Sequence, residues 1–182
     1  MFIPANNYVI PSFSYLGGFM TALEIHSTKN FMKHLLSGDT FDIFLLEEAV
    51  ISTANTYTID GHINLDFYPP EERSPEAVPY EFRPWTELKG LCFDLIKGKY
   101  TPLFFKFVLH LMPLNTSRLT QDADNADKLK ALILNIRYDG NKILLTTGTS
   151  YRTFVPGREI DMNWDHFLCT YLEEKGIGYE KL

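Results

Sequence analysis

The spacing of apolar residues along the chain predicts three amphipathic helices. In the first, apolar side chains recur at i, i+1, i+4 and i+5 from Phe31 to Leu36, which places them on one face of a helix. Ser27 or Thr28 can cap its start, and Gly38 stands where a glycine commonly follows a helix end. The other two helices are expected from Pro84 to Gly98 and from about Asp161 or Asn163 to Gly176.

Alternation of apolar and polar residues predicts the strands. A short strand is expected at residues 21–26, where Leu23 and Ile25 alternate with more polar neighbours. Residues 103–112 are apolar on both alternating faces, a pattern typical of a strand at the centre of a sheet.

Two dipeptides are typical of two-residue hairpin turns. Asp60-Gly61 follows a stretch rich in β-branched and aromatic residues at 43–59, and it would pair Ile59 with His62. Asp139-Gly140 would turn a second hairpin that runs from residue 130 to about 154.

The order of these elements predicts the fold class. Successive strands are linked mostly by hairpins, so the sheet should be largely antiparallel. We therefore expect an α+β protein, with a mainly antiparallel β-sheet built from hairpins and about three helices packed on one face. A parallel doubly wound fold would need a helix after nearly every strand.

A proline-rich segment at residues 69–84 interrupts the pattern. It holds five of the ten prolines and four glutamates, so we expect a surface excursion rather than a strand or a helix. Residues 114–127 are polar and are expected to form a loop. Neither side of the excursion completes a fold alone, which predicts one domain over residues 20–182.

Residues 1–19 contain no Asp, Glu, Lys or Arg, and their aromatic residues are spread between prolines and glycines. A signal peptide needs a basic start and a continuous apolar run, and this segment has neither. Three interpretations stay open: the true start is Met20, the segment is an extended arm that wraps the domain or a partner, or it is a weak lipid-facing tail.

Composition and charge narrow the class of protein. The 182 residues are 45% hydrophobic and 22% charged, which indicates a globular domain with a real core and excludes disordered and collagen-like chains. The formal net charge of −6 disfavours general nucleic-acid binding, because phosphate contacts need a basic face. No stretch approaches the roughly 18 uncharged apolar residues of a membrane span, and we expect a cytoplasmic protein.

The two cysteines, Cys92 and Cys169, lie among apolar residues on predicted helices. Buried free thiols are the favoured interpretation, and a disulfide or a reactive thiol is the alternative.

The common signatures of cofactor, metal and hydrolase sites are absent from the sequence. Asp161-x-Asn163-x-Asp165 imitates the start of a calcium loop, but His166 stands at the position that requires glycine and Leu172 at the position that requires an acid. Acidic residues that favour a helix N-terminus are the better explanation. We expect no cofactor and no metal site.

The first predicted hairpin would present a polar face with aromatic residues. Such a face could bind a polar ligand or a protein partner, and a solvated sheet face is the plainer alternative. Its residues would be Asn55, Tyr57, His62, Asn64, Asp66 and Tyr68.

A basic turn after the second predicted helix could bind an anion through Lys97, Lys99 and Thr101. Arg152, close to the turn at 155–157, is a further candidate, since arginine recognises carboxylates and phosphates. The alternative is that the lysines offset the dipole at the end of a helix that Gly98 caps.

Three stretches of the sequence together carry a resemblance to known proteins. They are Gly38-Asp39-Thr40-Phe41-Asp42-x-Phe44-Leu45, Asn55-Thr56-Tyr57-Thr58-Ile59-Asp60-Gly61 and Leu95-Ile96-Lys97-Gly98-Lys99-Tyr100-Thr101-Pro102-Leu103. The combination resembles a small family of uncharacterised single-domain proteins of anaerobic Gram-positive bacteria. The resemblance covers roughly Met20 to Phe154, with the last helix left open, and it implies a start near Met20 but no activity and no site residues.

Three functions stay open. We favour a non-enzymatic binding or protein-interaction module, with a homodimer through residues 1–19 or a sheet edge as one form of it. An acid–base or hydrolytic enzyme is the first alternative, and its site would have to assemble from His62, Asp66, Tyr57, His110 and Arg152. A nucleic-acid-associated protein is the second alternative, and it would use Lys89, Lys97, Lys99 and Lys106.

Overall fold

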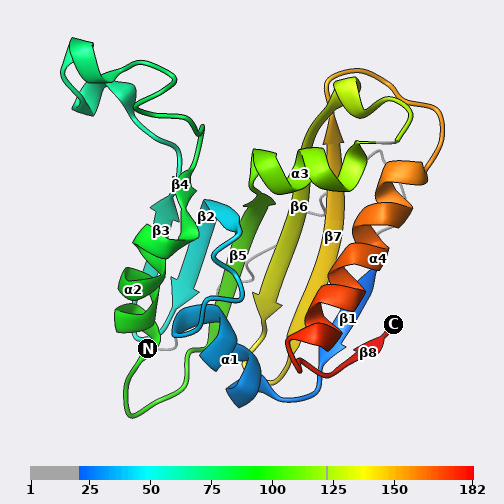
Figure 1. Ribbon diagram of the computed structural model, residues 1–182. Helices are drawn as coiled ribbons and strands as arrows, with labels where there is room; N and C mark the ends of the chain where they lie inside the picture. The colour runs from blue at the N-terminus through cyan, green and yellow to red at the C-terminus, as the bar shows by residue number, and fades with distance from the viewer. Residues whose placement is uncertain (1–20, 122) are drawn as a thin grey trace, which may run out of the picture.

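A computed structural model describes residues 21–121 and 123–182 and is built on one eight-stranded antiparallel sheet (Figure 1). The strand order is β3-β2-β5-β6-β7-β1-β8, and β4 also pairs with β2. The strands are β1 (Ala22–Ile25), β2 (Phe44–Ser52), β3 (Thr56–Asp60), β4 (Arg83–Pro84), β5 (Phe104–Leu111), β6 (Leu129–Tyr138), β7 (Ile143–Tyr151) and β8 (Tyr179–Lys181). The predicted α+β class is confirmed, and the apolar strand β5 lies inside the sheet between β2 and β6.

Four helices pack on one face of this sheet (Figure 1). They are α1 (Thr28–Leu36), α2 (Trp85–Ile96), α3 (Pro113–Thr120) and α4 (Glu159–Glu174). The prediction of about three helices missed α3, because its stretch is mostly polar and was expected to be a loop. Pro113 suits a first helical position, and Leu119 packs against the core.

The opposite face of the sheet, called the open face here, carries the residues that alternate with the core positions. On β5 these are Lys106, Val108 and His110, while Phe107 and Leu109 between them are fully buried under the helices. Among the residues that the structure describes, no helix lies on the open face (Figure 1).

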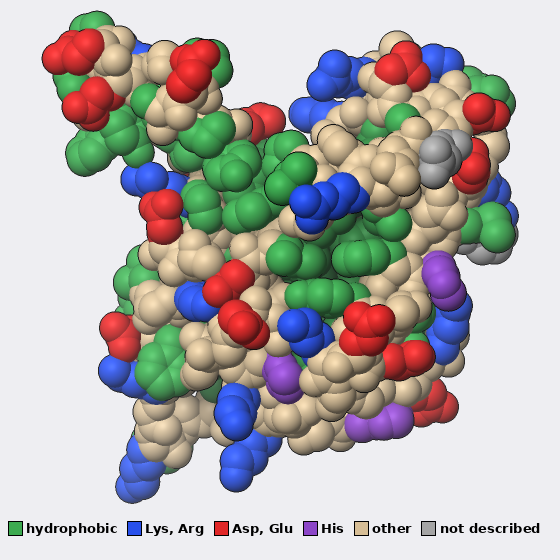
Figure 2. All heavy atoms as spheres, viewed as in Figure 1, with side chains coloured by type: hydrophobic (Ala, Val, Ile, Leu, Met, Phe, Trp, Pro, Cys, Tyr) green, Lys and Arg blue, Asp and Glu red, His purple; other side chains and the backbone are tan. Residues whose placement is uncertain are grey.

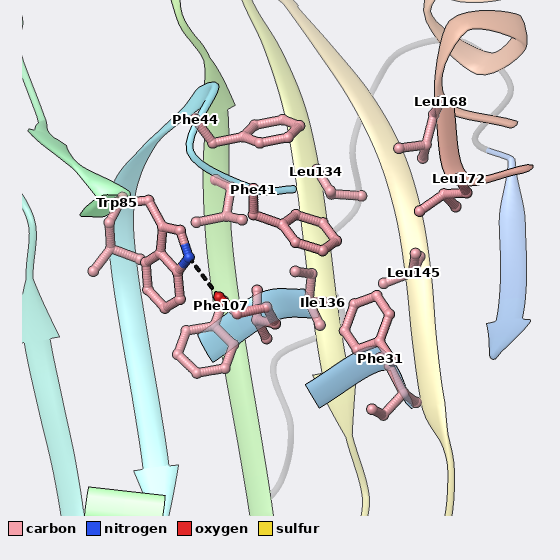
Figure 3. Close-up of a cluster of buried hydrophobic side chains, with 14 of the residues drawn as sticks. Phe31, Phe41, Phe44, Trp85, Phe107, Leu134, Ile136, Leu145, Leu168 and Leu172 are labelled. Carbon is pink, nitrogen blue, oxygen red and sulfur yellow. Dashed lines mark hydrogen bonds between the residues drawn. The ribbon is translucent and has the colours of Figure 1, made fainter. Parts of the chain in front are cut away.

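The core lies between the helices and the sheet (Figure 3). Trp85 at the start of α2 is fully buried, contacts the ring of Phe107 edge-on at 5.3 Å between centroids, and donates its indole N–H to the carbonyl of Leu35 at 2.9 Å. Trp164 of α4 likewise donates to the carbonyl of Ile133 at 3.0 Å. Each tryptophan therefore ties a helix to its neighbours by packing and by one hydrogen bond.

Two acids of α4 hold the helix against β7. Asp161 accepts a hydrogen bond from Thr149 at 2.5 Å, and Asp165, one turn later, accepts one from Thr147. Residues at i and i+4 share a helix face, as alternate residues share a strand face, so the two pairs fit together. The calcium-like motif thus serves docking of the helix.

The prediction of a hairpin around Asp60-Gly61 is wrong. Strand β3 pairs with β2 through a turn in which Thr53 donates to the carbonyl of Asn55 at 2.8 Å, and residues 62–68 do not pair with β3. Gly61 does not form a turn but lies close to the backbone of β2. Its N–H donates to the carbonyl of Glu47 at 2.8 Å, at a β-bulge in β2. The second predicted hairpin is correct, since β6 and β7 pair around residues 139–142.

After Gly61 the chain leaves the sheet and forms a projecting lobe, residues 63–81 (Figure 1). Acidic and hydrophobic side chains gather on it (Figure 2). Arg73 fastens the lobe, because its guanidinium donates to the carbonyl of Tyr68 at 2.8 Å and pairs with Asp66 at 3.3 Å. Phe67 remains 81% exposed.

Both cysteines are free thiols. Cys92 is buried in α2, and burial raises the pKa of its thiol to about 12, which makes it unreactive in the native protein. Cys169 of α4 is half-buried.

The predictions for residues 1–19 lie outside the described residues. Within the described part of the chain, no helix has both the length and the apolar content that crossing a membrane requires.

Candidate functional site

The six residues predicted to share a hairpin face are not brought together. Asn55 lies in the turn between β2 and β3, and Tyr57, 39% exposed, points to the side of β3 that faces α2. Asn64, Asp66 and Tyr68 belong to the lobe, where Asn64 accepts a hydrogen bond from the backbone N–H of Asp66 at 3.0 Å and starts a 3₁₀ turn. The face fails because it depends on the incorrect hairpin.

His62 lies at the base of the lobe in a cluster that the sequence did not predict. The ring of Phe82 lies between two imidazoles, 4.5 Å from His62 and 4.6 Å from His110 between centroids. His62 is paired with Asp60 at 2.7 Å and lies 4.0 Å from Glu81, while His110 donates to the carboxylate of Glu47. Two histidine–carboxylate pairs thus flank one buried phenylalanine.

The β-bulge in β2 explains why Glu47 reaches His110. A bulge inserts one extra residue, so neighbouring side chains can point to the same face of the sheet. Glu47 and Glu48 both contact open-face residues of β5, His110 and Lys106 respectively. The hydrogen bond from His110 is the main cause that holds the pKa of the Glu47 carboxyl below its ordinary value of 4.5, against a smaller opposing effect of burial.

We expect Glu47→Gln to lower the melting temperature at neutral pH by a few degrees, because a neutral hydrogen bond replaces a charge-assisted one at a cost of about 0.5–1.5 kcal/mol. A depressed folded-state pKa means that the stabilisation is complete above about pH 4.5 and is lost as the pH falls through the folded pKa. Thermal unfolding of the wild type and the variant from pH 7 to pH 3 measures the difference between their melting temperatures. This difference should stay constant down to about pH 4.5 and then become smaller. Glu71→Gln in the lobe is the control, and an equal effect there would contradict the assignment.

The five residues suggested for an enzyme do not converge. His62 and His110 share the cluster, but Phe82 separates their rings. Asp66 is paired with Arg73 in the lobe, Tyr57 is on the other side of the sheet, and Arg152 follows β7, where its backbone N–H donates to Lys128 at 2.8 Å. Hydrogen-bond reach, which a shared acid–base site requires, is not met among them.

The four lysines suggested for nucleic-acid binding do not form one surface. Lys89 is held by Asp42 at 2.5 Å and by the carbonyl of Gly38 at 2.9 Å. Lys106 lies on the open face, paired with Glu48 at 2.6 Å. The other two lie at a separate pocket.

This pocket encloses about 360 Å³ between the ends of α1 and α2 and the loop that leads into β5. Basic side chains gather around this end of the molecule, opposite the acidic lobe (Figure 2). The pocket brings together Lys97, Lys99 and Thr101 as the sequence suggested, but not Arg152. Its apolar walls come from Met32, Leu36, Phe93, Ile96, Phe105 and Tyr138.

The lysines at the pocket differ in their surroundings. Lys97 is paired with Asp94 at 2.6 Å and lies over the ring of Phe93. Lys99 lies 5.5 Å from the ring centroid of Tyr100, and Lys33 comes from the last turn of α1. Within the described residues, neither Lys33 nor Lys99 forms an ion pair.

Sequence reasoning missed Lys33, and no local signal could have found it. Strands β2, β3 and β4, the lobe and α2 separate Lys33 from Lys99 in the chain, and only the packing of α1 beside α2 brings both to one pocket. In the described residues, no three His, Cys, Asp or Glu side chains are placed to hold a metal ion.

Comparisons with known proteins give one match. A family model described as a family of unknown function, DUF5721, matches residues 34–180. Searches of curated proteins and of solved structures found no significant match. The family match confirms the resemblance to single-domain proteins without an assigned activity, and it extends to the last helix. The chain therefore belongs to the family of unknown function DUF5721.

Proposed function

We propose that this protein is a binding module that holds an amphipathic anion, a ligand with an apolar body and one acidic group, in the pocket between α1, α2 and β5. The observation that carries the proposal is an apolar pocket with Lys33 and Lys99 at its edge. Ligand pockets are commonly apolar, with a few polar groups that fix the orientation of the ligand.

The walls of the pocket suit a flat or chain-like apolar body. Phe105 and Tyr138 are stacked at 4.9 Å between centroids, and Tyr138 is fixed because its hydroxyl donates to the carbonyl of Gly140 at 2.9 Å. Met32 on α1 adds a flexible, polarisable wall. An aromatic or acyl group that entered here would replace water at preformed apolar surface.

The lysines favour an anionic ligand, although the C-termini of two helices at the same pocket favour cations. α1 and α2 both end at this pocket, and helix C-termini favour cations. Part of the lysine charge is therefore balanced by the helix dipoles, and Lys97 is balanced by Asp94. Lys33 and Lys99 remain to meet an acidic group of the ligand, so we expect one such group at the edge of the pocket and none in its interior.

The test uses 8-anilinonaphthalene-1-sulfonate, an aromatic sulfonate whose fluorescence rises in apolar surroundings. We expect saturable binding that Lys33→Gln with Lys99→Gln weakens about threefold to tenfold, since two exposed charge contacts contribute up to roughly 1 kcal/mol each. High salt should weaken binding to the wild type and have less effect on the double variant.

The matched control is Lys142→Gln with Lys175→Gln, which removes the same charge outside the pocket. Near-ultraviolet circular dichroism should show that all three proteins keep their tertiary packing. Equal weakening by both double variants would mean that only net charge matters, and the pocket assignment would then be wrong.

Contact with a protein partner through the lobe is the second candidate. Its support is the exposed ring of Phe67, which lies edge-on to Tyr68 at 5.5 Å between centroids on a lobe that Arg73 fastens. An exposed aromatic residue on a fixed support is typical of interaction hot spots.

A further inference from the structure

The two faces of the sheet are covered unequally. All four described helices lie on one face, and the open face has no described helix (Figure 1). On β5 the open face carries two apolar side chains, Phe104 and Val108, which alternate with Lys106 and His110. Phe104 and Val108 thus offer apolar surface on a face that no described helix covers.

Two lysines on the open face are already paired with glutamates. Lys106 pairs with Glu48 at 2.6 Å, and Lys142 pairs with Glu24 at 2.6 Å. The guanidinium of Arg137 lies 5.6 Å from the ring centroid of Phe104. What remains between them is a set of half-buried, uncharged side chains, Val50, Val108, Leu144, Asn135 and Thr146. Such a surface suits an occupant that has no charge of its own.

The first 19 residues have this composition. They contain no Asp, Glu, Lys or Arg and five aromatic residues, Phe2, Tyr8, Phe13, Tyr15 and Phe19. The described chain that follows them enters the sheet at β1, where Ala22 pairs with Thr146 of the open face.

Residues 1–19 are long enough to reach across the open face. Five strand spacings separate β1 from β3, which is about 24 Å, and 19 extended residues reach roughly 60 Å. A tethered segment also binds its own chain at an effective concentration in the millimolar range, which favours it over a second copy.

We propose that residues 1–19 dock on the open face of their own chain, over Val50, Val108 and Leu144, and form the second apolar layer of the sheet. The proposal is independent of the pocket between α1 and α2, which is on the other face.

Limited chymotrypsin digestion of the full chain tests the proposal, because this protease cuts beside aromatic residues. Phe154, which is 89% exposed, is the internal reference for an accessible site. Docking predicts that the sites in residues 1–19 are cut at least about tenfold more slowly than the site at Phe154, as expected when cleavage requires local opening. Cleavage of the segment as fast as at Phe154 would overturn the proposal.

Variants of the open face make the test specific. Leu144→Thr, or the milder Val108→Thr if the first unfolds the protein, should speed cleavage within residues 1–19 severalfold and leave the rate at Phe154 unchanged. Leu103→Thr, at an exposed apolar position before β5, should change neither rate. If neither open-face variant exposes the segment, the proposal is wrong.

Light scattering during size-exclusion chromatography distinguishes a second copy of the chain. The proposal predicts the monomer mass of 21.0 kDa at all concentrations. A dimer that Leu144→Thr dissociates would show that a second copy covers the open face, and would overturn docking within one chain.

Discussion

Replacing Gly61 with alanine is expected to destabilise the protein by about 3 kcal/mol or more, a loss of roughly 6–12 °C in melting temperature. A Cβ at this position would lie 1.8 Å from the carbonyl oxygen of Leu46 and 2.7 Å from its carbonyl carbon. Both are backbone atoms, so no side chain can move aside to relieve the contact.

The strands would have to separate at the bulge instead. This would break the hydrogen bond from Gly61 N–H to Glu47 at 2.8 Å, and it would disturb the bond from Arg83 N–H to the carbonyl of Gly61 at 2.9 Å. The end of β3, the position of the Glu47 carboxylate and the base of the lobe depend on these contacts. Urea and thermal unfolding, followed by circular dichroism, measure the loss.

Gly90→Ala is the matched control, because it adds the same methyl group to an open position in α2. It should stabilise the protein by about 0.5–1 kcal/mol, since glycine is costly inside a helix. A wild-type melting temperature for Gly61→Ala would show that the bulge can widen without cost, and would contradict the close approach.

Trp85→Ala is the second substitution with a large expected effect, a loss of about 3–5 kcal/mol of stability. The side chain is fully buried between α2, α1 and β5, and removing it leaves a cavity beside Phe107. It also leaves the carbonyl of Leu35 without its hydrogen-bond donor.

Trp85→Phe separates packing from hydrogen bonding. The ring is retained in part while the donor is lost, so we expect a smaller loss of about 1–3 kcal/mol, the cost of an unsatisfied buried polar group together with reduced packing. Phe154→Ala, at an exposed position, should stay within about 0.5 kcal/mol of the wild type. Chemical unfolding of the three variants should follow this order, and equal stability of Trp85→Ala and the wild type would contradict the role given to the indole.

Much of the fold is predictable from local pattern. Period-two alternation gave β5, β6 and β7, period-3.6 spacing gave α1, α2 and α4, and Ser27 caps α1 as expected by accepting from the backbone N–H of Asn30. These signals are local, because burial on one face of an element repeats at a fixed spacing in the sequence. The sequence pattern did not predict α3, because the packing of this helix depends on α4 and the core more than on its own few apolar residues.

The candidate sites were predictable only in part. Lys97, Lys99 and Thr101 are neighbours in the sequence and lie at one pocket, whereas Lys33 joins them only through the packing of α1 beside α2. The hairpin face failed because Asp60-Gly61 has the composition of a turn, while the carbonyl of Leu46, distant in the sequence, requires a glycine at the same position.

The sequence by itself determined the antiparallel α+β class, the helix that ends at Gly176 with a positive φ of 70°, and the uncharged character of residues 1–19. Those features depend on periodicity, backbone freedom and composition, which can be read from neighbouring residues. Only the tertiary structure decided that Glu47 meets His110 across a bulge, that Gly61 lies against the backbone of Leu46, and which lysines meet at the pocket. Each of these depends on strand register or helix packing between residues that are distant in the sequence, and local pattern carries no information about either.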